Sequence, residues 1–110
     1  MKRKKPLERL LSAAGSIFQP GYSYYMRADN PIRVHNRIIY IVQDGAEPDA
    51  LVFKCPCGCK KTIHLNLLTD TRPCWSFSLQ KGKITIYPSI RGTGGCRSHF
   101  VIREGTVVWV

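Results

Sequence analysis

The chain has 110 residues and a net charge of +10, from 17 lysines and arginines against 7 aspartates and glutamates. A chain of this length fits a single domain that buries about two thirds of the surface exposed by its unfolded form. No apolar run approaches the roughly 20 residues that a membrane-spanning helix needs. Together with an ordinary hydrophobic content of 44%, this excludes a protein built on membrane-spanning helices and favours a soluble globular one.

The N-terminal segment, residues 1–18, differs from the rest of the chain. Basic residues at positions 2–5 form a tail, and the leucines that follow predict a short helix. Glu8 and Arg9 interrupt its apolar stretch, so the segment does not resemble a signal peptide and we expect a cytoplasmic protein. We therefore expect a basic tail and short helix at 1–18, and a separate domain at 19–110.

The remaining basic residues are scattered along the chain. A surface that neutralises phosphates gains binding free energy from released counterions, so the charge of +10 admits weak contact with nucleic acids. Because the basic residues are not concentrated in one structural element, a solvated basic surface explains the charge better than a dedicated nucleic-acid-binding element does. Non-specific nucleic-acid binding stays as an alternative function.

From residue 22 onward, short runs rich in β-branched and aromatic residues are separated by turn residues. The predicted strands cover residues 22–27, 32–42, 50–54, 62–68, 75–79, 83–88, 99–103 and 106–110. In the fourth, Ile63 and Leu65 alternate with His64, which places this histidine on the surface. His35 is predicted to lie on the surface as well. We expect an all-β fold, a small antiparallel β sandwich or barrel with a short N-terminal helix and a metal site between two loops.

Two segments, KCPCGCK and GGCRSHF, carry sulfur and imidazole side chains. In the first, Cys55, Cys57 and Cys59 stand at every second position, so adjacent thiols of the series can face one way if the backbone bends. The proline and the glycine between them favour such a bent loop. In the second, Cys96 and His99 follow a glycine pair with C-x-x-H spacing, which lets both side chains turn onto one ion.

Three cysteines and one histidine are a common ligand set of closed structural zinc sites. Our first choice is Cys55, Cys57, Cys96 and His99, but Cys59 could replace either early cysteine, so all five residues are candidate ligands. Free cysteines can also act as small buried hydrophobes, which explains three thiols in five positions poorly. An odd total of 5 cysteines fits a closed disulfide framework poorly too.

Zinc is not the only metal that this pattern admits. Rieske proteins bind a [2Fe–2S] cluster with C-x-H and C-x-x-H segments on a small β fold, but here Cys57 stands where the first histidine would be. The departure favours Zn²⁺. A Rieske-like [2Fe–2S] electron-transfer protein stays as an alternative.

The pattern favours a closed site over a catalytic one. A catalytic zinc usually keeps three protein ligands, an open position and a nearby carboxylate, whereas here four ligands are available and every acidic residue lies outside both segments. A thiol nucleophile would be the spare cysteine of the cluster or Cys74, which otherwise is a core or surface thiol. The residues therefore favour a binding or adaptor protein over an enzyme.

The runs LVFKCPCGCKKTIHLNLL, RPCW, ITIYPSI and CRSHFVIREGTVVW, within residues 50–110, resemble a family of small bacterial and phage proteins. Its members share CPCGC, a tryptophan after Arg-Pro, a Pro-Ser-Ile or Pro-Ser-Val run, and C-x-S-H-F. The resemblance implies a zinc-binding β domain with the same five candidate ligands and carries no established activity. The family's glycine after the third cysteine is Lys60 here. Trp75, Pro88 and Ser89 belong to the shared pattern, where packing and a turn explain them as well as function does.

Some members of that family lie near genes of ubiquitin-like conjugation, beside relatives of activating and conjugating enzymes. The resemblance therefore implies a protein partner, a ubiquitin-like or conjugation-system component, while the lack of a long apolar run predicts no membrane partner. The expected function is that of a zinc-binding β module acting as an adaptor in such a system or in a phage-related one.

Overall fold

The computed structural model describes residues 21–92, 96 and 98–110, so the tail and helix predicted at 1–18 lie outside it and that division of the chain stays a prediction. None of the described residues belongs to a helix that is long and apolar enough to cross a membrane. Instead they form strands β1 (Ser23–Arg27), β2 (Ile38–Val42), β3 (Ala50–Lys54), β4 (Thr62–Asn66), β5 (Ser76–Gln80), β6 (Lys83–Arg91), β7 (His99–Arg103) and β8 (Thr106–Trp109). The all-β prediction is confirmed.

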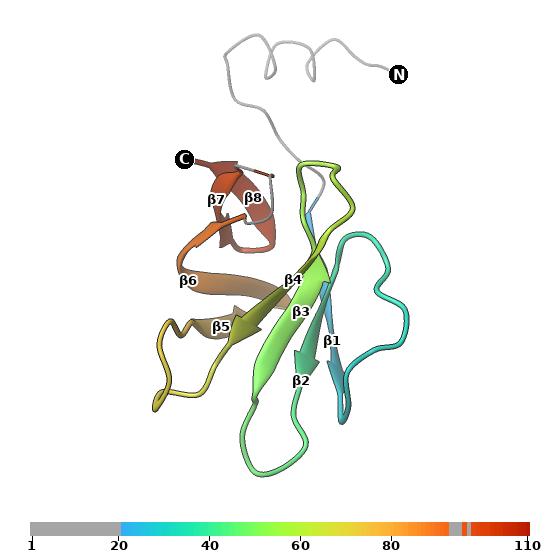
Figure 1. The fold of residues 1–110 in the computed structure, drawn as a ribbon, viewed down its shortest axis with the longest axis vertical. Coiled ribbons are helices and arrows are strands. Elements are labelled where there is room, and N and C mark those ends of the chain that lie inside the picture. The colour runs from blue at the N-terminus through green and yellow to red at the C-terminus, as the bar shows by residue number, and fades with distance from the viewer. Residues whose placement is uncertain (1–20, 93–95, 97) are drawn as a thin grey trace, which may run out of the picture.

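The strands form two sheets of four, in the orders β1-β2-β3-β4 and β5-β6-β7-β8 (Figure 1). Neighbouring strands pair antiparallel, with the exception of β1 and β2, which run parallel with Ser23 opposite Ile38. The connection 28–37 makes this possible because it returns to the start of β1, where the Ser23 N–H donates to the carbonyl of Arg37 at 2.9 Å. One parallel pair thus stands within a fold that was expected to be antiparallel.

Two strand boundaries differ from the sequence prediction. The run predicted as a strand at 32–42 is extended only from Ile38, because Arg37 just before it has a φ of 65° that interrupts an extended backbone. Conversely, β6 continues to Arg91, three residues beyond its predicted end, since its last part pairs with β7 through Ile90 and Phe100.

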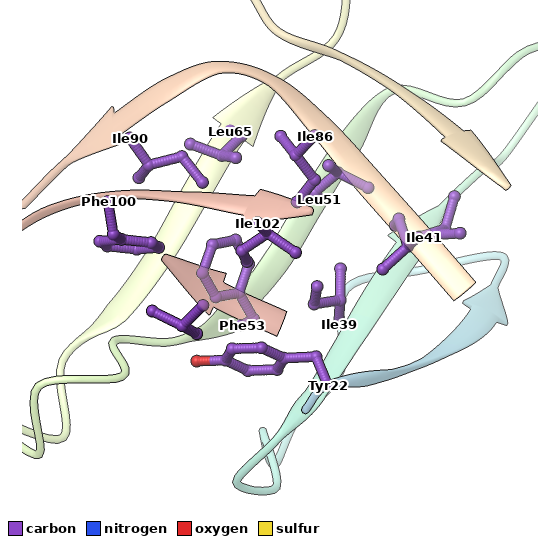
Figure 2. Packing of buried hydrophobic residues seen from close by; sticks show 12 residues of the cluster. Tyr22, Ile39, Ile41, Leu51, Phe53, Leu65, Ile86, Ile90, Phe100 and Ile102 are labelled. Atoms are coloured by element: carbon purple, nitrogen blue, oxygen red, sulfur yellow. The ribbon is translucent and has the colours of Figure 1, made fainter. Parts of the chain in front are cut away.

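The core lies between the sheets and is filled by alternate residues of the strands (Figure 2). Phe53 of β3 and Phe100 of β7 are its largest fully buried side chains. The other buried members of the cluster are Tyr22, Ile39, Ile41, Leu51, Leu65, Ile84, Ile86, Ile90, Ile102 and Val107. Both sheets therefore contribute to one apolar layer, as expected for a sandwich.

A second, smaller cluster lies on the other face of the first sheet. Tyr40 and Val42 of β2 and Val52 of β3 are buried there, with Val34 and Ile38 packed against them. The connection 28–37 supplies Val34, so this irregular segment covers part of the outer face. Strand β2 is consequently buried on both sides, which explains its continuous apolar sequence IIYIV.

Candidate functional site

Two loops, one between β3 and β4 and one between β6 and β7, bring four cysteines together. Cys55 directly follows β3, Cys57 and Cys59 lie in the turn that leads to β4, and Cys96 lies in the connection between β6 and β7. Their sulfur atoms all lie within 4.8 Å of one another, so the group could hold a metal ion. We call these four residues the cysteine cluster.

The turn after β3 owes its shape to two residues with positive φ. Gly58 has a φ of 93° and Lys60 one of 67°, a region that glycine adopts without the steric cost that a side chain brings. The Cys55 N–H donates to the carbonyl of Lys61 at 2.9 Å and closes the turn. A glycine, which the resemblance implies at position 60, would adopt this conformation without that steric cost.

The distances within the cluster suit one tetrahedral ion. Cys57 Sγ lies 3.1 Å from Cys96 Sγ, and Cys55 Sγ lies 3.4 Å from Cys57 Sγ and 3.5 Å from Cys96 Sγ. Four sulfurs bound to zinc at about 2.3 Å would lie roughly 3.8 Å apart in a regular tetrahedron. The cluster is therefore near the required spacing, and four thiolates would complete the coordination of a zinc ion.

Ser98 and Gly92 pack directly against the cluster. Ser98 Oγ lies 3.3 Å from Cys55 Sγ and 3.1 Å from Cys96 Sγ, within hydrogen-bond reach of both. A Cβ atom at residue 92 would lie 2.7 Å from Ser98 Oγ and 3.2 Å from Cys96 Sγ. Glycine at this position thus lets the backbone of β6 approach the cysteines, and the hydroxyl group orients their sulfurs.

Hydrogen bonds and burial shift the pKa values of three of these thiols in different directions. The Ser98 hydroxyl group, with help from Cys57, lowers the pKa of Cys96 to about 6. The hydrogen bond with Cys96 raises the pKa of Cys57 to about 12, and burial raises the pKa of Cys55. Since metals bind thiolates, the lowered pKa brings Cys96 closer than Cys55 or Cys57 to the ligating state at neutral pH.

His99, the first residue of β7, contacts Ser89 near the end of β6. Its Nε2 lies 2.9 Å from Ser89 Oγ, which joins the first residue of β7 to the end of β6. The register between these strands shifts between Ile86 and Ile90, so the pairing is irregular beside Ser89. This irregularity lies where the hydroxyl group meets the imidazole.

The Ser89–His99 pair is partly buried, and Trp75, which directly precedes β5, holds it in place. The indole Nε1–H of Trp75 donates to the carbonyl of Ser89 at 3.2 Å and fixes the serine backbone. Among the described residues, no carboxylate hydrogen-bonds to His99. The pair thus supplies a hydroxyl nucleophile and a neighbouring base, two of the three groups of a catalytic triad.

The structure arranges the five predicted ligands differently from our first choice. It brings Cys59 into the cluster with Cys55, Cys57 and Cys96, and it places the His99 imidazole on Ser89. Which of the five bind a metal stays a prediction. Cys74 lies outside the cluster, where its sulfur accepts a hydrogen bond from Arg72 Nη1 at 2.9 Å. His64 and His35 are exposed, as expected.

Sequence reasoning missed the Ser89–His99 pair. Both residues stand in runs that the sequence singled out, PSI and CRSHF, but His99 had been assigned to the metal and Ser89 to a turn. The available signal was a hydroxyl group directly after one predicted strand and an imidazole at the start of the next. The irregular register that makes them meet could not be inferred from the pattern of residues.

Two four-stranded sheets, a four-cysteine cluster that could hold a metal ion, and a serine–histidine pair beside it define a small all-β protein with a candidate hydrolytic site. The family model described as "Bacterial ubiquitination-like system serine protease (BubE)" matches residues 26–110. The match covers most of the chain, and the chain therefore belongs to this family. No curated protein and no solved structure matched the chain. The expected link to ubiquitin-like systems is supported.

Proposed function

We propose that this protein is a serine hydrolase of a bacterial ubiquitination-like system, with Ser89 as nucleophile and His99 as general base. The observation that carries the proposal is the 2.9 Å contact between His99 Nε2 and Ser89 Oγ. A nucleophile and a base within hydrogen-bond reach are the core of covalent acyl-transfer catalysis. The family description, which names a serine protease, supports the same chemistry.

In the proposed reaction, Ser89 Oγ attacks the carbonyl carbon of an amide substrate while its proton passes to His99 Nε2. The tetrahedral intermediate collapses as the C–N bond breaks, and the imidazolium gives its proton to the leaving amine. Water then attacks the acyl ester, transferring a proton to the same nitrogen, and Ser89 regains its proton when the acid is released. Trp75 holds the serine carbonyl during both halves through its indole N–H.

Ser98 is the alternative nucleophile, but its surroundings speak against it. Its hydroxyl group lies against two sulfurs of the cysteine cluster, with no imidazole contact. We infer that Ser98 supports the metal ligands and that Ser89 reacts. The two serines thus supply a matched pair of variants.

A fluorophosphonate probe tests the proposal without knowledge of the substrate, because it labels activated serines covalently. We expect labelling of the wild-type protein at Ser89, seen by mass spectrometry, and a loss of at least about 10³-fold in labelling rate for Ser89→Ala and His99→Ala. Ser76→Ala, on an exposed position of β5, should label as the wild type does. If the wild-type protein is not labelled, or if Ser89→Ala is labelled as fast as the wild type, Ser89 is excluded as the nucleophile.

For the metal, we propose one structural Zn²⁺ held by the cysteine cluster. All four sulfurs lie within 4.8 Å of one another, which suits one ion better than a [2Fe–2S] cluster, whose ligands divide between two irons. Four thiolates leave no open position, so the metal would stabilise the fold and take no part in the reaction. A coloured preparation with visible absorption would favour the iron–sulfur alternative.

A binding or adaptor role in the same system is the second candidate. Three exposed apolar side chains on β1 and the connection after it favour it: Tyr25, Met26 and Ile32 are 60%, 50% and 102% exposed. Such surfaces often contact other proteins. We propose a ubiquitin-like protein or a conjugation-system component as the partner and the cytoplasm as the location. Nucleic-acid binding, the remaining alternative, would weaken steeply with added salt.

A further inference from the structure

A groove of about 310 Å³ lies along strand β4 and is lined also by Cys55, Cys59 and Cys96 of the cysteine cluster. Thr62 and His64 of β4 line it, as does Arg91 at the end of β6. Trp75 also lines the groove, and its indole N–H holds the Ser89 carbonyl. We call this feature the β4 groove.

Strand β4 is an edge strand, paired with β3 on one side only. The ladder is bounded by bonds from Cys55 N–H to the carbonyl of Lys61 and from Leu67 N–H to that of Asp49. Along an antiparallel strand, the backbone N–H and C=O groups of successive residues point alternately toward the partner strand and away from it. The backbone groups of Ile63 and Leu65 therefore point to β3, and those of Thr62 and His64 point to the free side.

Asn66 is the next residue whose backbone points to the free side of β4, and it already accepts a hydrogen bond there. The Trp75 N–H donates to the carbonyl of Asn66 at 2.8 Å, which continues the sheet edge by one bond. Within the described chain, no backbone bond outside the strand ladders involves Thr62 or His64. Their polar groups are open to an extended chain, which could add to the sheet as a further strand.

The charges of the groove select among extended chains. Lys61 and Arg91 line it, and none of the described residues in its lining is an aspartate or a glutamate; the thiols of Cys55, Cys59 and Cys96 are its other ionisable groups apart from His64. The net charge of +10 acts in the same direction over longer distance. An acidic segment would therefore be drawn in and held more strongly than a basic one.

Building on the proposed hydrolase function, we propose that the substrate is an extended, acidic polypeptide segment that binds as an added β-strand along Thr62 and His64. Main-chain hydrogen bonds to these two residues hold the segment in register. Lys61 and Arg91 contact its acidic side chains, and Trp75, which lines the groove and holds the Ser89 carbonyl, marks the end from which the segment continues to Ser89. The proposed substrate is therefore an unfolded stretch of protein, since a folded surface could not supply the free main-chain groups.

The test measures binding in the Ser89→Ala protein, so that no cleavage occurs, with fluorescein-labelled β-casein as an unfolded acidic probe. His64→Pro removes the outward N–H together with the imidazole and is tolerated on an edge strand, while His64→Ala removes the imidazole and keeps the N–H. We expect binding at least about fivefold weaker for His64→Pro, because a carbonyl of the probe loses its hydrogen-bond donor, and unchanged for His64→Ala. Equal binding by the two variants would overturn the proposal.

Two further measurements keep the result independent of any folding defect. In protein carrying only Ser89→Ala, hydrogen exchange of the His64 amide should slow when β-casein is added, and unchanged exchange at saturation would contradict strand addition. Lys61→Gln should weaken binding while Lys83→Gln, on the exposed start of β6, should not. Stronger binding of polylysine than of β-casein would exclude an acidic ligand. Fluorophosphonate labelling of otherwise wild-type protein reports the hydrolase function separately, so failure of either proposal is distinguishable.

Discussion

At the scale of single residues, the site depends on glycine and hydroxyl positions as much as on the sulfurs. Gly92 has space for a hydrogen atom only, because a Cβ there would lie 2.7 Å from Ser98 Oγ and 3.0 Å from the carbonyl oxygen of Cys96. Ser98 in turn lies against two sulfurs of the cluster. A methyl group at residue 92 would therefore displace a candidate metal ligand without altering any ligand atom.

We expect Gly92→Ala to weaken zinc binding by about 10- to 100-fold, as changes to residues that orient metal ligands do. Competition with a chromophoric chelator would measure the affinity. Gly45→Ala is the matched control, since nothing lies within 4 Å of a Cβ at that position. Equal affinities for the two variants would show that the approach of Gly92 does not position Cys96.

At the scale of elements, one buried side chain ties two strands together. The hydroxyl group of Tyr22, just before β1, donates to the carbonyl of Lys54 at the end of β3 at 2.6 Å. Its ring packs edge-on against Phe53 at a centroid distance of 5.5 Å. Burial raises the pKa of Tyr22 well above its usual value of about 10.

This shift predicts a loss of stability at alkaline pH. The unfolded chain ionises Tyr22 above about pH 10 while the folded protein keeps it neutral, so the unfolded state binds fewer protons and the free energy of unfolding falls as pH rises. Tyr22→Phe should cost about 1 kcal/mol at neutral pH, the value of one hydrogen bond, and should flatten the decline above pH 10. Chemical denaturation from pH 7 to 11 would measure both, and an equally steep decline in the variant would assign the effect to other groups.

The strands also show which parts of the fold can be predicted from the sequence. Alternation such as that of Ile63, His64 and Leu65 predicted strands and their buried faces, because one face of each strand meets the core. The sequence could not predict that β1 and β2 pair in parallel or that Arg37 ends the extended run before β2. Both depend on where the connection 28–37 lies in space. The register shift beside Ser89 is non-local in the same way, since it is a property of the pairing with β7.

At the scale of the whole molecule, the cysteine cluster joins the two sheets. Cys55, Cys57 and Cys59 are attached to strands of the first sheet, whereas Cys96 belongs to a connection within the second. The convergence of the two segments was predicted from the ligand spacing, but the contact of His99 with Ser89 was not. A metal bound here would hold the sheets together at one end of their shared core.

Three single variants decide which residues bind the metal. We expect Cys59→Ser to lower both the zinc content and the melting temperature, because binding of a structural metal is part of the folding free energy. His99→Ala should keep its zinc, and Cys74→Ser, outside the cluster, should keep both zinc and melting temperature. Metal analysis and thermal denaturation would measure these. Loss of zinc in His99→Ala, with retention in Cys59→Ser, would instead support the ligand set of three cysteines and one histidine.

The position of the cluster also has a consequence for the order of folding. Cys55 and Cys96 are 41 residues apart in the chain, and β4, β5 and β6 lie between them. A link across a loop of this length would lower the conformational entropy of the unfolded chain by an amount equivalent to about 4 kcal/mol, on the estimate used for disulfides. During synthesis the fourth sulfur emerges after six of the eight described strands. Full coordination of a metal would therefore be a late step, taken when the first sheet is already complete.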